Sequence, residues 1–185
     1  MNMKFNPSQL ATCLAVAGLM VVLGSTTVLA EEVNGVQVMR HVPDTYELAS
    51  ALFPKPVRGL VIHQEQPAAD SPKIAFMINF EYNSARVLDG SLPYLDSVGK
   101  MLSQKNLQNK DLIIEGHADA KGGYTYNLSL SEQRAQAVKR YLVSVHHIDP
   151  KRLLCVGKGN TELLNPARPF APENRRVQFL AWHHE

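Results

Sequence analysis

Two oppositely charged residues, Asp119 and Arg134, stand on either side of a glycine-bearing loop in the second half of the chain. The carboxylate of Asp119 could accept hydrogen bonds from an ammonium group. The guanidinium of Arg134 could bind a carboxylate through two parallel hydrogen bonds, a geometry that lysine does not reproduce. In one pocket, the pair would therefore suit a ligand that carries both groups. The alternative is a structural salt bridge between Asp119 and Arg134 across the loop.

The residues around this pair predict the elements that position it. The run Leu112–Glu115 is typical of a buried strand. Ser129 and Glu132, three positions apart, have the spacing of a capping box, which predicts that a helix begins near Ser129. Asp119 would then follow the strand, and Arg134 would lie in the first turns of the helix. Such strand–loop–helix units place residues at the carboxyl edge of a sheet, where ligands commonly bind.

The rest of this region continues the alternation of strands and helices. Apolar residues recur at helical spacing from Leu92 to Leu102 and from Ala135 to Val145. Strands are predicted over Lys73–Phe80, Leu153–Val156 and Arg175–Ala181, and Gly157–Gly159 is interpreted as a turn. The alternation indicates a layered α/β domain.

The first thirty residues have the organisation of a secretory signal peptide. Lys4 supplies a positive charge, Leu10–Leu23 is an apolar run, and Val28–Ala30 is a small-residue cleavage site. We therefore predict cleavage after Ala30 and a mature protein in the periplasm. The competing interpretation is an uncleaved inner-membrane anchor. Against it, Gly24–Thr27 interrupts the apolar run, and a spanning helix needs about 20 apolar residues.

Residues 31–72 are interpreted as a separate N-terminal segment. Asp44 and Glu47 form a capping-box pair that predicts a short helix. Gly59–His63 is a candidate strand, and Gln64–Pro72, polar with two prolines, is a predicted linker. The segment is too short for a transmembrane barrel, which needs at least about eight strands of ten residues. We expect it to bind a protein partner in the cell envelope.

The composition is that of an ordinary globular protein, with 45% apolar and 19% charged residues. The formal net charge of +2 gives no reason to expect nucleic acid as a partner. Removing the signal peptide would leave one cysteine, Cys155, within an apolar run. We interpret it as a small buried hydrophobic residue.

Two separated motifs resemble those of the OmpA-like peptidoglycan-binding domain. The family pattern GHTD…YN..LS..RA is matched here by Gly116-His117-Ala118-Asp119, Tyr126-Asn127 and Leu130-Ser131-Glu132-Gln133-Arg134-Ala135, and its closing NRRV by Asn174-Arg175-Arg176-Val177. The similarity covers residues 74–181, and we assign residues 73–185 to this domain. The resemblance implies a mixed four-stranded sheet with helices packed on one face. It also implies a protein that binds the peptidoglycan of the cell wall without catalysis.

The resemblance further implies a ligand and the residues that bind it. In the family, residues at the positions of Asp119 and Arg134 hold meso-diaminopimelate of the peptidoglycan stem peptide by its amino and carboxylate groups. Asn127 is similar to the family's loop asparagine, and Arg176 to an arginine near the pocket. We expect Arg175 to be structural or exposed.

The main alternative is a metal-dependent periplasmic hydrolase. Glu115, His117 and Asp119 alternate, so on an extended strand they would point to one face like metal ligands. No HExxH or CxxC pattern provides a second ligand group. We therefore predict no catalytic residue, no metal and no cofactor, and we interpret His117 as a structural histidine that bonds to the loop backbone. A further alternative is an interaction protein, in which the wall-binding domain serves to tether residues 31–72.

Overall fold

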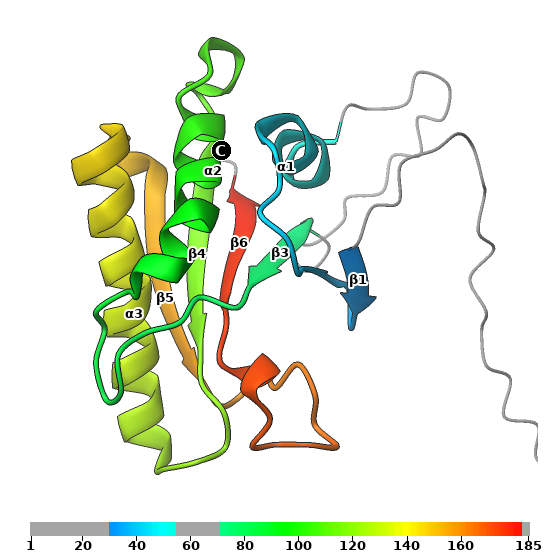
Figure 1. The fold of residues 1–185 in the computed structure, drawn as a ribbon, viewed down its shortest axis with the longest axis vertical. Helices are drawn as coiled ribbons and strands as arrows, with labels where there is room; N and C mark the ends of the chain where they lie inside the picture. The colour runs from blue at the N-terminus through cyan, green and yellow to red at the C-terminus, as the bar shows by residue number, and fades with distance from the viewer. Residues whose placement is uncertain (1–29, 55–70, 183–185) are drawn as a thin grey trace, which may run out of the picture.

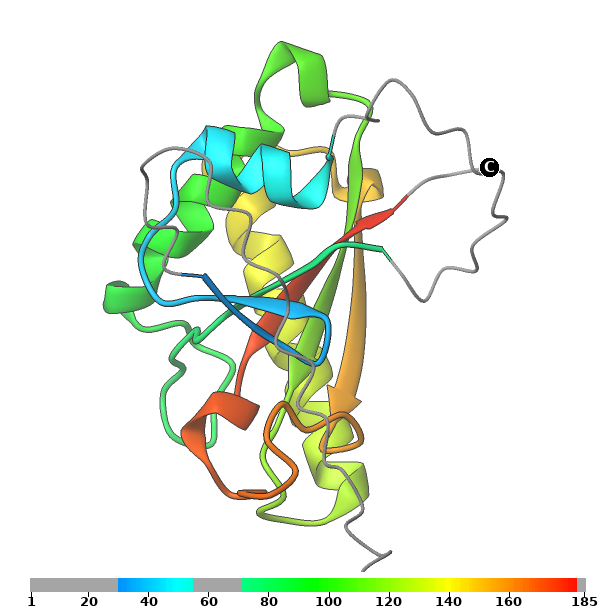
Figure 2. The same cartoon turned by 90° about the vertical axis from the view of Figure 1, so that its right-hand side faces the viewer.

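A mixed sheet in the order β1-β2-β3-β6-β4-β5 forms one layer of the molecule, and helices cover one of its faces (Figures 1 and 2). The computed structural model describes residues 30–54 and 71–182. The strands are β1 (Ala30–Val33), β2 (Val36–Met39), β3 (Lys73–Phe76), β4 (Asp111–His117), β5 (Leu153–Gly159) and β6 (Val177–Trp182). The helices are α1 (Thr45–Leu52), α2 (Leu92–Leu102) and α3 (Tyr124–His146). The predicted layered α/β class is confirmed, but the sheet has six strands instead of four.

The two additional strands come from the N-terminal segment. β1 and β2 form an antiparallel hairpin, and β2 pairs in parallel with β3. Asn34 and Gly35 connect them with φ of 54° and 74°, which are values that an Asn-Gly hairpin turn adopts without a steric penalty. The Asn34 amide also donates to the carbonyl oxygen of Leu164 at 3.2 Å. The hairpin therefore extends the sheet and is attached to a loop near the opposite end of the sequence.

The predicted short helix of this segment is present as α1. Asp44 accepts hydrogen bonds from two backbone N–H groups of the first turn, both at 2.8 Å, and Leu48 and Leu52 are buried in the main core. The signal peptide up to residue 29 and the candidate strand Gly59–His63 lie outside the described residues. Among the described residues, no helix combines the length and apolar character that crossing a membrane requires.

The helix that carries Arg134 begins earlier than predicted. α3 starts at Tyr124, with Gly123 at its N-cap position and no side-chain cap. Ser129 therefore lies within the helix, where its hydroxyl accepts a hydrogen bond from Gln133. The capping-box spacing was a misleading local signal here. Arg134 consequently lies in the third turn of α3 rather than in its first turns.

Several strand limits also differ from the prediction. β3 ends at Phe76 instead of Phe80, and β5 continues through Gly159, where a turn was predicted. β6 begins at Val177, two residues after the predicted start. Cys155 on β5 is partly buried and packs against the core, and burial raises the pKa of its thiol.

One face of α3 packs closely on the sheet. Ala135, Val138 and Leu142 are fully buried, as the predicted apolar stripe requires, but Val145 at its end is 49% exposed. Among the sheet glycines, Gly116 of β4 leaves the least space, since an added Cβ there would overlap the backbone oxygen of Ser131. Any side chain at this position would push α3 away from β4. The glycine therefore sets the separation between the strand and the helix.

Candidate functional site

Several chain segments meet at one edge of the sheet and enclose a pocket. β2 is parallel to β3, and β3 and β4 are each antiparallel to β6. The carboxyl ends of β2, β3 and β4 and the amino end of β6 therefore share this edge. In Figure 1 the ends of β4 and β6 point to the lower part of the molecule. The pocket has a volume of about 990 Å³. Its lining comes from Arg40 after β2, from residues 77–83 after β3, from eight residues between positions 118 and 134 of the β4–α3 unit, and from four residues between positions 168 and 175 before β6.

Asp119 lies just past the end of β4 and is only 9% exposed. One carboxylate oxygen accepts a hydrogen bond from the backbone N–H of Lys121 at 2.9 Å. The other accepts a hydrogen bond from the guanidinium of Arg175 at 2.6 Å. A carboxylate has about four acceptor sites, so Asp119 can still bind a donor from a ligand.

Arg134 reaches the same pocket from α3. Its Nε donates to the backbone oxygen of Ser84 at 3.2 Å, and the guanidinium lies 4.8 Å from the centre of the Phe80 ring. The two terminal nitrogens make no hydrogen bond within the described residues, and no ion pair joins Arg134 to Asp119 there. Burial lowers the pKa of Arg134, and the nearby Asp119 charge opposes this effect. The guanidinium is thus fixed through Nε, and its two terminal nitrogens could donate two parallel hydrogen bonds to a ligand.

Two polar contacts fix the walls of the pocket. Asn127 is 2% exposed, and its amide donates to the backbone oxygen of Asp119 at 3.3 Å, which ties the first turn of α3 to the loop. The hydroxyl of Tyr126 bonds to the side chain of Asn83, which ties α3 to the segment after β3. Asn127 also lines the pocket, and its amide holds the backbone of the loop at Asp119.

The two arginines of the closing motif have different surroundings. Arg175 lines the pocket and binds Asp119, and its side chain is 46% exposed. Arg176 does not line the pocket. It is 4% exposed and donates to Gln178 at 2.6 Å and to the backbone oxygen of Glu162 at 3.1 Å. Burial lowers the pKa of Arg176 to about 10. The structure therefore brings Asp119, Asn127 and Arg134 together with Arg175 instead of Arg176.

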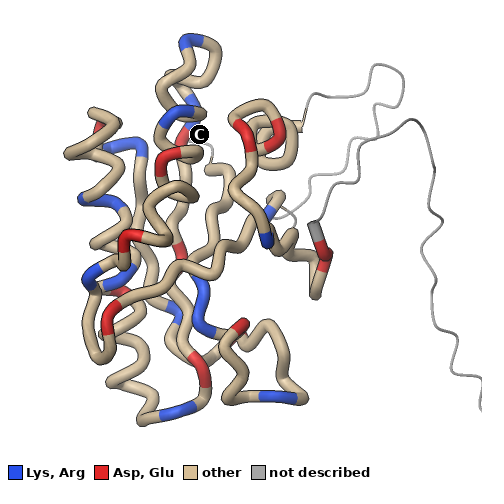
Figure 3. The backbone as a smooth tube through the Cα atoms, viewed as in Figure 1, with Lys and Arg blue, Asp and Glu red and all other residues tan. Residues whose placement is uncertain are grey.

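The loop before β6 holds Arg175 in place. Asn174 is completely buried, accepts from the backbone N–H of Asn165 and donates to two backbone oxygens of the same loop. Arg168 and Glu173 form an ion pair at 2.6 Å. This loop and the β4–α3 loop lie near each other at the lower end of the molecule, and each carries charges of both signs (Figure 3).

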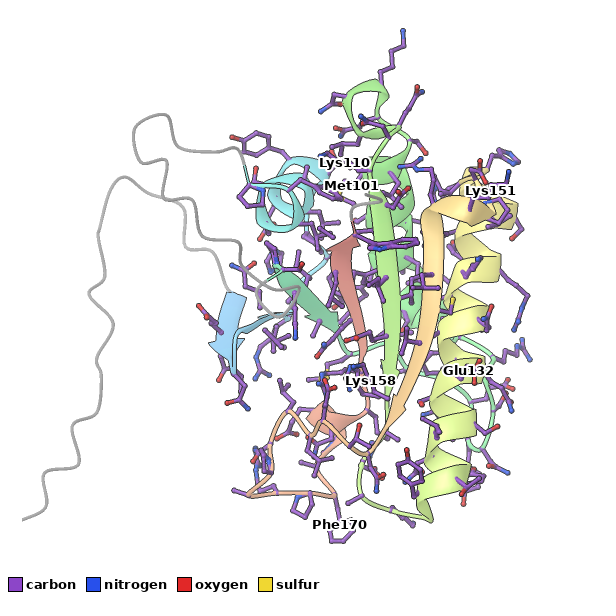
Figure 4. The ribbon with its side chains drawn as sticks, turned by 180° about the vertical axis from the view of Figure 1, so that it is seen from behind. Met101, Lys110, Glu132, Lys151, Lys158 and Phe170 are labelled. Carbon is purple, nitrogen blue, oxygen red and sulfur yellow. The ribbon has the colours of Figure 1, made fainter. Side chains whose placement is uncertain are left out.

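Of the three residues of the metal-site alternative, Glu115 and His117 lie near each other and Asp119 lies apart from them. His117 Nε2 lies 3.7 Å from Glu115 Oε2, beyond hydrogen-bond distance, whereas Asp119 turns to Arg175. Within residues 30–54 and 71–182, no three His, Cys, Asp or Glu side chains gather as a metal site. Lys158 on the neighbouring strand β5 forms an ion pair with Glu115. Figure 4 shows Lys158 on the side of the sheet that faces away from α2.

His117 differs from its predicted role. Its backbone N–H donates to the backbone oxygen of Arg176 at 2.9 Å. Neither ring nitrogen has a hydrogen-bond partner in the described part of the chain, so the predicted bond from the ring to the loop backbone is wrong. Burial lowers the pKa of His117, which favours a neutral ring at neutral pH.

Four cationic residues of the pocket were not assigned to it from the sequence: Arg40, Lys121, Arg168 and Arg175. The Asn34-Gly35 hairpin signal could have indicated that Arg40 follows a strand. Lys121 stands two positions after Asp119 in the same loop and could have been included with it. Exposed aromatic rings border this region as well, with Tyr82 95% exposed on the segment after β3 and Phe170 66% exposed on the loop before β6 (Figure 4).

Comparison with known proteins agrees with this fold. Residues 79–176 match the model of the OmpA family. Outer membrane protein A of Bordetella avium is 34% identical over 119 residues, which are 62% of this chain and 60% of that protein. The peptidoglycan-associated lipoprotein of Pseudomonas aeruginosa is 34% identical over 107 residues, 54% of this chain and 58% of that protein. The chain thus aligns with about three fifths of the length of each relative. The solved OmpA-like domain of FopA1 from Francisella tularensis has a TM-score of 0.51 at 21% identity, over 61% of this chain and 75% of that one.

Proposed function

Because the chain belongs to the OmpA family, we propose that it binds peptidoglycan without catalysis and attaches to the cell wall through the pocket at the sheet edge. One of its relatives is a peptidoglycan-associated lipoprotein. The observation that carries the proposal is that Asp119 and Arg134 line one pocket without forming an ion pair with each other in the described structure. The Arg134 charge and the remaining acceptor sites of Asp119, which also pairs with Arg175, are therefore available to a ligand with groups of both signs.

The ligand chemistry that suits these residues is that of meso-diaminopimelate. Its side-chain ammonium would bind the remaining acceptor sites of Asp119. Its side-chain carboxylate would bind the free edge of Arg134 through two parallel hydrogen bonds. Asn127 positions the backbone of Asp119, and Arg175 takes the place in the pocket that the family resemblance gave to Arg176. Each group of the ligand then has a partner of opposite charge.

The cellular setting follows from the same proposal. The relatives are envelope proteins by their names, which supports a periplasmic, wall-associated protein. The proposed cleavage of a signal peptide after Ala30 rests on the sequence pattern alone. Part of the segment 31–72 pairs with the sheet as the β1–β2 hairpin. The segment 31–72 is the proposed contact with an envelope partner.

The test is a titration of the wild-type protein against soluble wall fragments that carry either meso-diaminopimelate or lysine in the stem peptide. Lysine keeps the ammonium but lacks the second carboxylate, so Arg134 would lose its partner. We expect weaker binding of the lysine fragment by roughly tenfold or more, the effect of one charge-assisted bond. Equal affinity for the two fragments would contradict the assignment of Arg134 to this carboxylate. Absence of binding to both fragments and to purified sacculi would contradict wall binding itself.

A further inference from the structure

The charges that line the pocket are paired, with two exceptions among the described residues. Five cationic and three anionic side chains line it, a formal surplus of two positive charges. The pairs are Arg175 with Asp119, Arg168 with Glu173, Arg40 with Glu31, and Glu81 with Arg86. Lys121 and Arg134 have no ion-pair partner in the part of the chain that the structure describes. Diaminopimelate offers one free carboxylate besides its ammonium, and Arg134 already accounts for it.

Lys121 stands at a defined place beside the ligand-binding carboxylate. It lies in the loop between β4 and α3, and its backbone N–H donates to Asp119 at 2.9 Å. This bond closes a short turn, which fixes where the lysine leaves the chain relative to Asp119. Its side chain is exposed and lines the pocket together with that of Arg134. The pocket therefore has one unpaired cation on the loop and another on α3.

We propose that Lys121 binds a second carboxylate of the same stem peptide, outside the diaminopimelate side chain. The assignment rests on the proposed function. Two groups of the peptide have this chemistry: the α-carboxylate of the γ-linked glutamate that precedes diaminopimelate, and the terminal carboxylate of the residue that follows it. With both ionised and with its N-terminus acylated, as it is in the wall, a stem tetrapeptide carries a net charge of about −2 at neutral pH. That charge is equal in size and opposite in sign to the surplus of the pocket.

The size of the pocket supports a ligand longer than one amino acid. Its volume of about 990 Å³ lies at the upper end of the range for pockets that enclose drug-sized ligands, roughly 300–1,000 Å³. The stem-peptide residues on either side of diaminopimelate would therefore have room beside Asp119 and Arg134. Their carboxylates would then lie within the field of Lys121.

The experiment is a calorimetric titration with four synthetic stem tetrapeptides, each acetylated at its N-terminus so that its charge matches that of the wall-linked peptide. They have both carboxylates free, only the glutamate α-carboxylate amidated, only the terminal carboxylate amidated, or both amidated. Each is titrated into wild type, Lys121→Gln and the control Lys105→Gln. Lys105 is another exposed lysine, located before β4 and thus far from the end of that strand where the pocket lies. Both variants lose the same charge.

We expect Lys121→Gln to weaken binding of the unmodified peptide by about two- to fivefold, the range for an exposed ion pair. Lys105→Gln should bind like wild type. Amidating the carboxylate that Lys121 contacts should weaken wild-type binding to a similar extent and remove the difference between wild type and Lys121→Gln. The single amidation that has this effect shows whether Lys121 contacts the glutamate α-carboxylate or the terminal carboxylate. The difference should also shrink as salt is added.

Other outcomes separate this assignment from the proposed function. If Lys121→Gln weakens all four peptides equally, the lysine contributes only a general field, and the assignment is overturned. The Lys121 assignment is also overturned if Lys121→Gln binds like wild type while Arg134→Ala loses binding. That result would leave the proposed function intact. If wild type binds none of the peptides, both are overturned.

Discussion

The carboxylate of Asp119 and the guanidinium of Arg175, 2.6 Å apart, join the end of β4 to the loop that leads into β6. The acid of this pair is the more buried member, with 12% of its side chain exposed against 46% for the arginine. A ligand ammonium that reaches Asp119 must therefore share the carboxylate with Arg175. The ion pair holds the carboxylate in one orientation at the pocket in the absence of a ligand.

Replacing Asp119 by Asn should weaken binding of diaminopimelate fragments. Asn keeps the shape and one acceptor oxygen but removes the charge. Loss of a charge-assisted bond costs about 1.5–3 kcal/mol, or roughly tenfold to a hundredfold in affinity. Solvent screening at this edge favours the lower figure. Titration of both proteins with the same fragment measures it.

The matched control for this change is Arg175→Gln, which removes the other member of the ion pair. If Asp119 binds the ligand directly, Arg175→Gln should weaken binding less than Asp119→Asn does. Equal losses would mean that the two residues act only by holding the loop.

Arg134→Lys should impair binding to sacculi almost as much as Arg134→Ala. The lysine keeps a positive charge but loses the planar bidentate edge and the stacking on Phe80. Pulldown with purified sacculi, together with thermal unfolding of each variant, checks this prediction. Variants that melt several degrees lower but still bind sacculi would show that Arg134 serves the fold instead.

Gly116→Ala should reduce both stability and binding. Its Cβ would overlap the backbone of α3 at Ser131, and overpacking of this kind costs about 1–3 kcal/mol. Movement of α3 would also shift Arg134 relative to Asp119. Urea unfolding and a fragment titration measure the two effects. Gly90→Ala is the control, because an added Cβ there meets nothing within 4 Å; similar losses in both variants would contradict the close-approach argument.

His117 should make the protein less stable as the pH falls. Burial lowers the pKa of its ring, Arg176 adds to this, and Glu115 and Glu162 oppose it without reversing it. The unfolded chain binds a proton near pH 6.5, about the value of free histidine, but the folded chain does so only at lower pH. Stability should therefore be lost as the pH drops below about 6.5, by up to about 1.4 kcal/mol per pH unit.

The measurement is urea unfolding of wild type and His117→Gln across this pH range. The variant should lose stability less steeply than wild type. His147→Asn should keep the wild-type slope, since that residue is exposed and Asn tolerates its left-handed φ of 54°. If the stability of His117→Gln falls with pH as steeply as that of wild type, the buried ring of His117 is not the cause of the pH dependence.

The strand–loop–helix unit around Asp119 and Arg134 could be predicted because its signals are local. The apolar run of β4, the glycines of the loop and the apolar stripe of α3 all stand close together in the sequence. The start of α3 could not be fixed in this way. Ser129 has a good capping pattern, but tertiary contacts near the loop, including the bond from Asn127 to Asp119, extend the helix back to Tyr124.

The choice between Arg175 and Arg176 depends on strand register, which the motif does not contain. Side chains alternate between the faces of a strand, so a shift of one residue exchanges them. With β6 beginning at Val177, whose side chain joins the core beneath the helices, Arg176 falls on the opposite face beside Gln178. Arg175 is left outside the strand and free to reach Asp119.

The β1–β2 hairpin was missed for a different reason. Its strands have four residues each, too few for a clear alternation of apolar and polar side chains. Their stability depends on the parallel pairing with β3, far along the sequence. The Asn-Gly turn is the only local sequence signal of the hairpin, and it does not indicate which strand β2 will pair with.

The position of β6 has a consequence for how the molecule is made. β6 is the last strand of the described chain, yet it lies between β3 and β4 and supplies the hydrogen bonds that join them. The chain is synthesised from its N-terminus, so β3, which pairs with β2, and β4, which pairs with β5, each lack a partner on one edge until β6 is present. The loop with Arg175, which lines the pocket, is also synthesised late, directly before β6. A nascent chain interrupted before Val177 would therefore have neither a continuous sheet nor a finished binding pocket, and its open edges would be exposed to pairing with other chains.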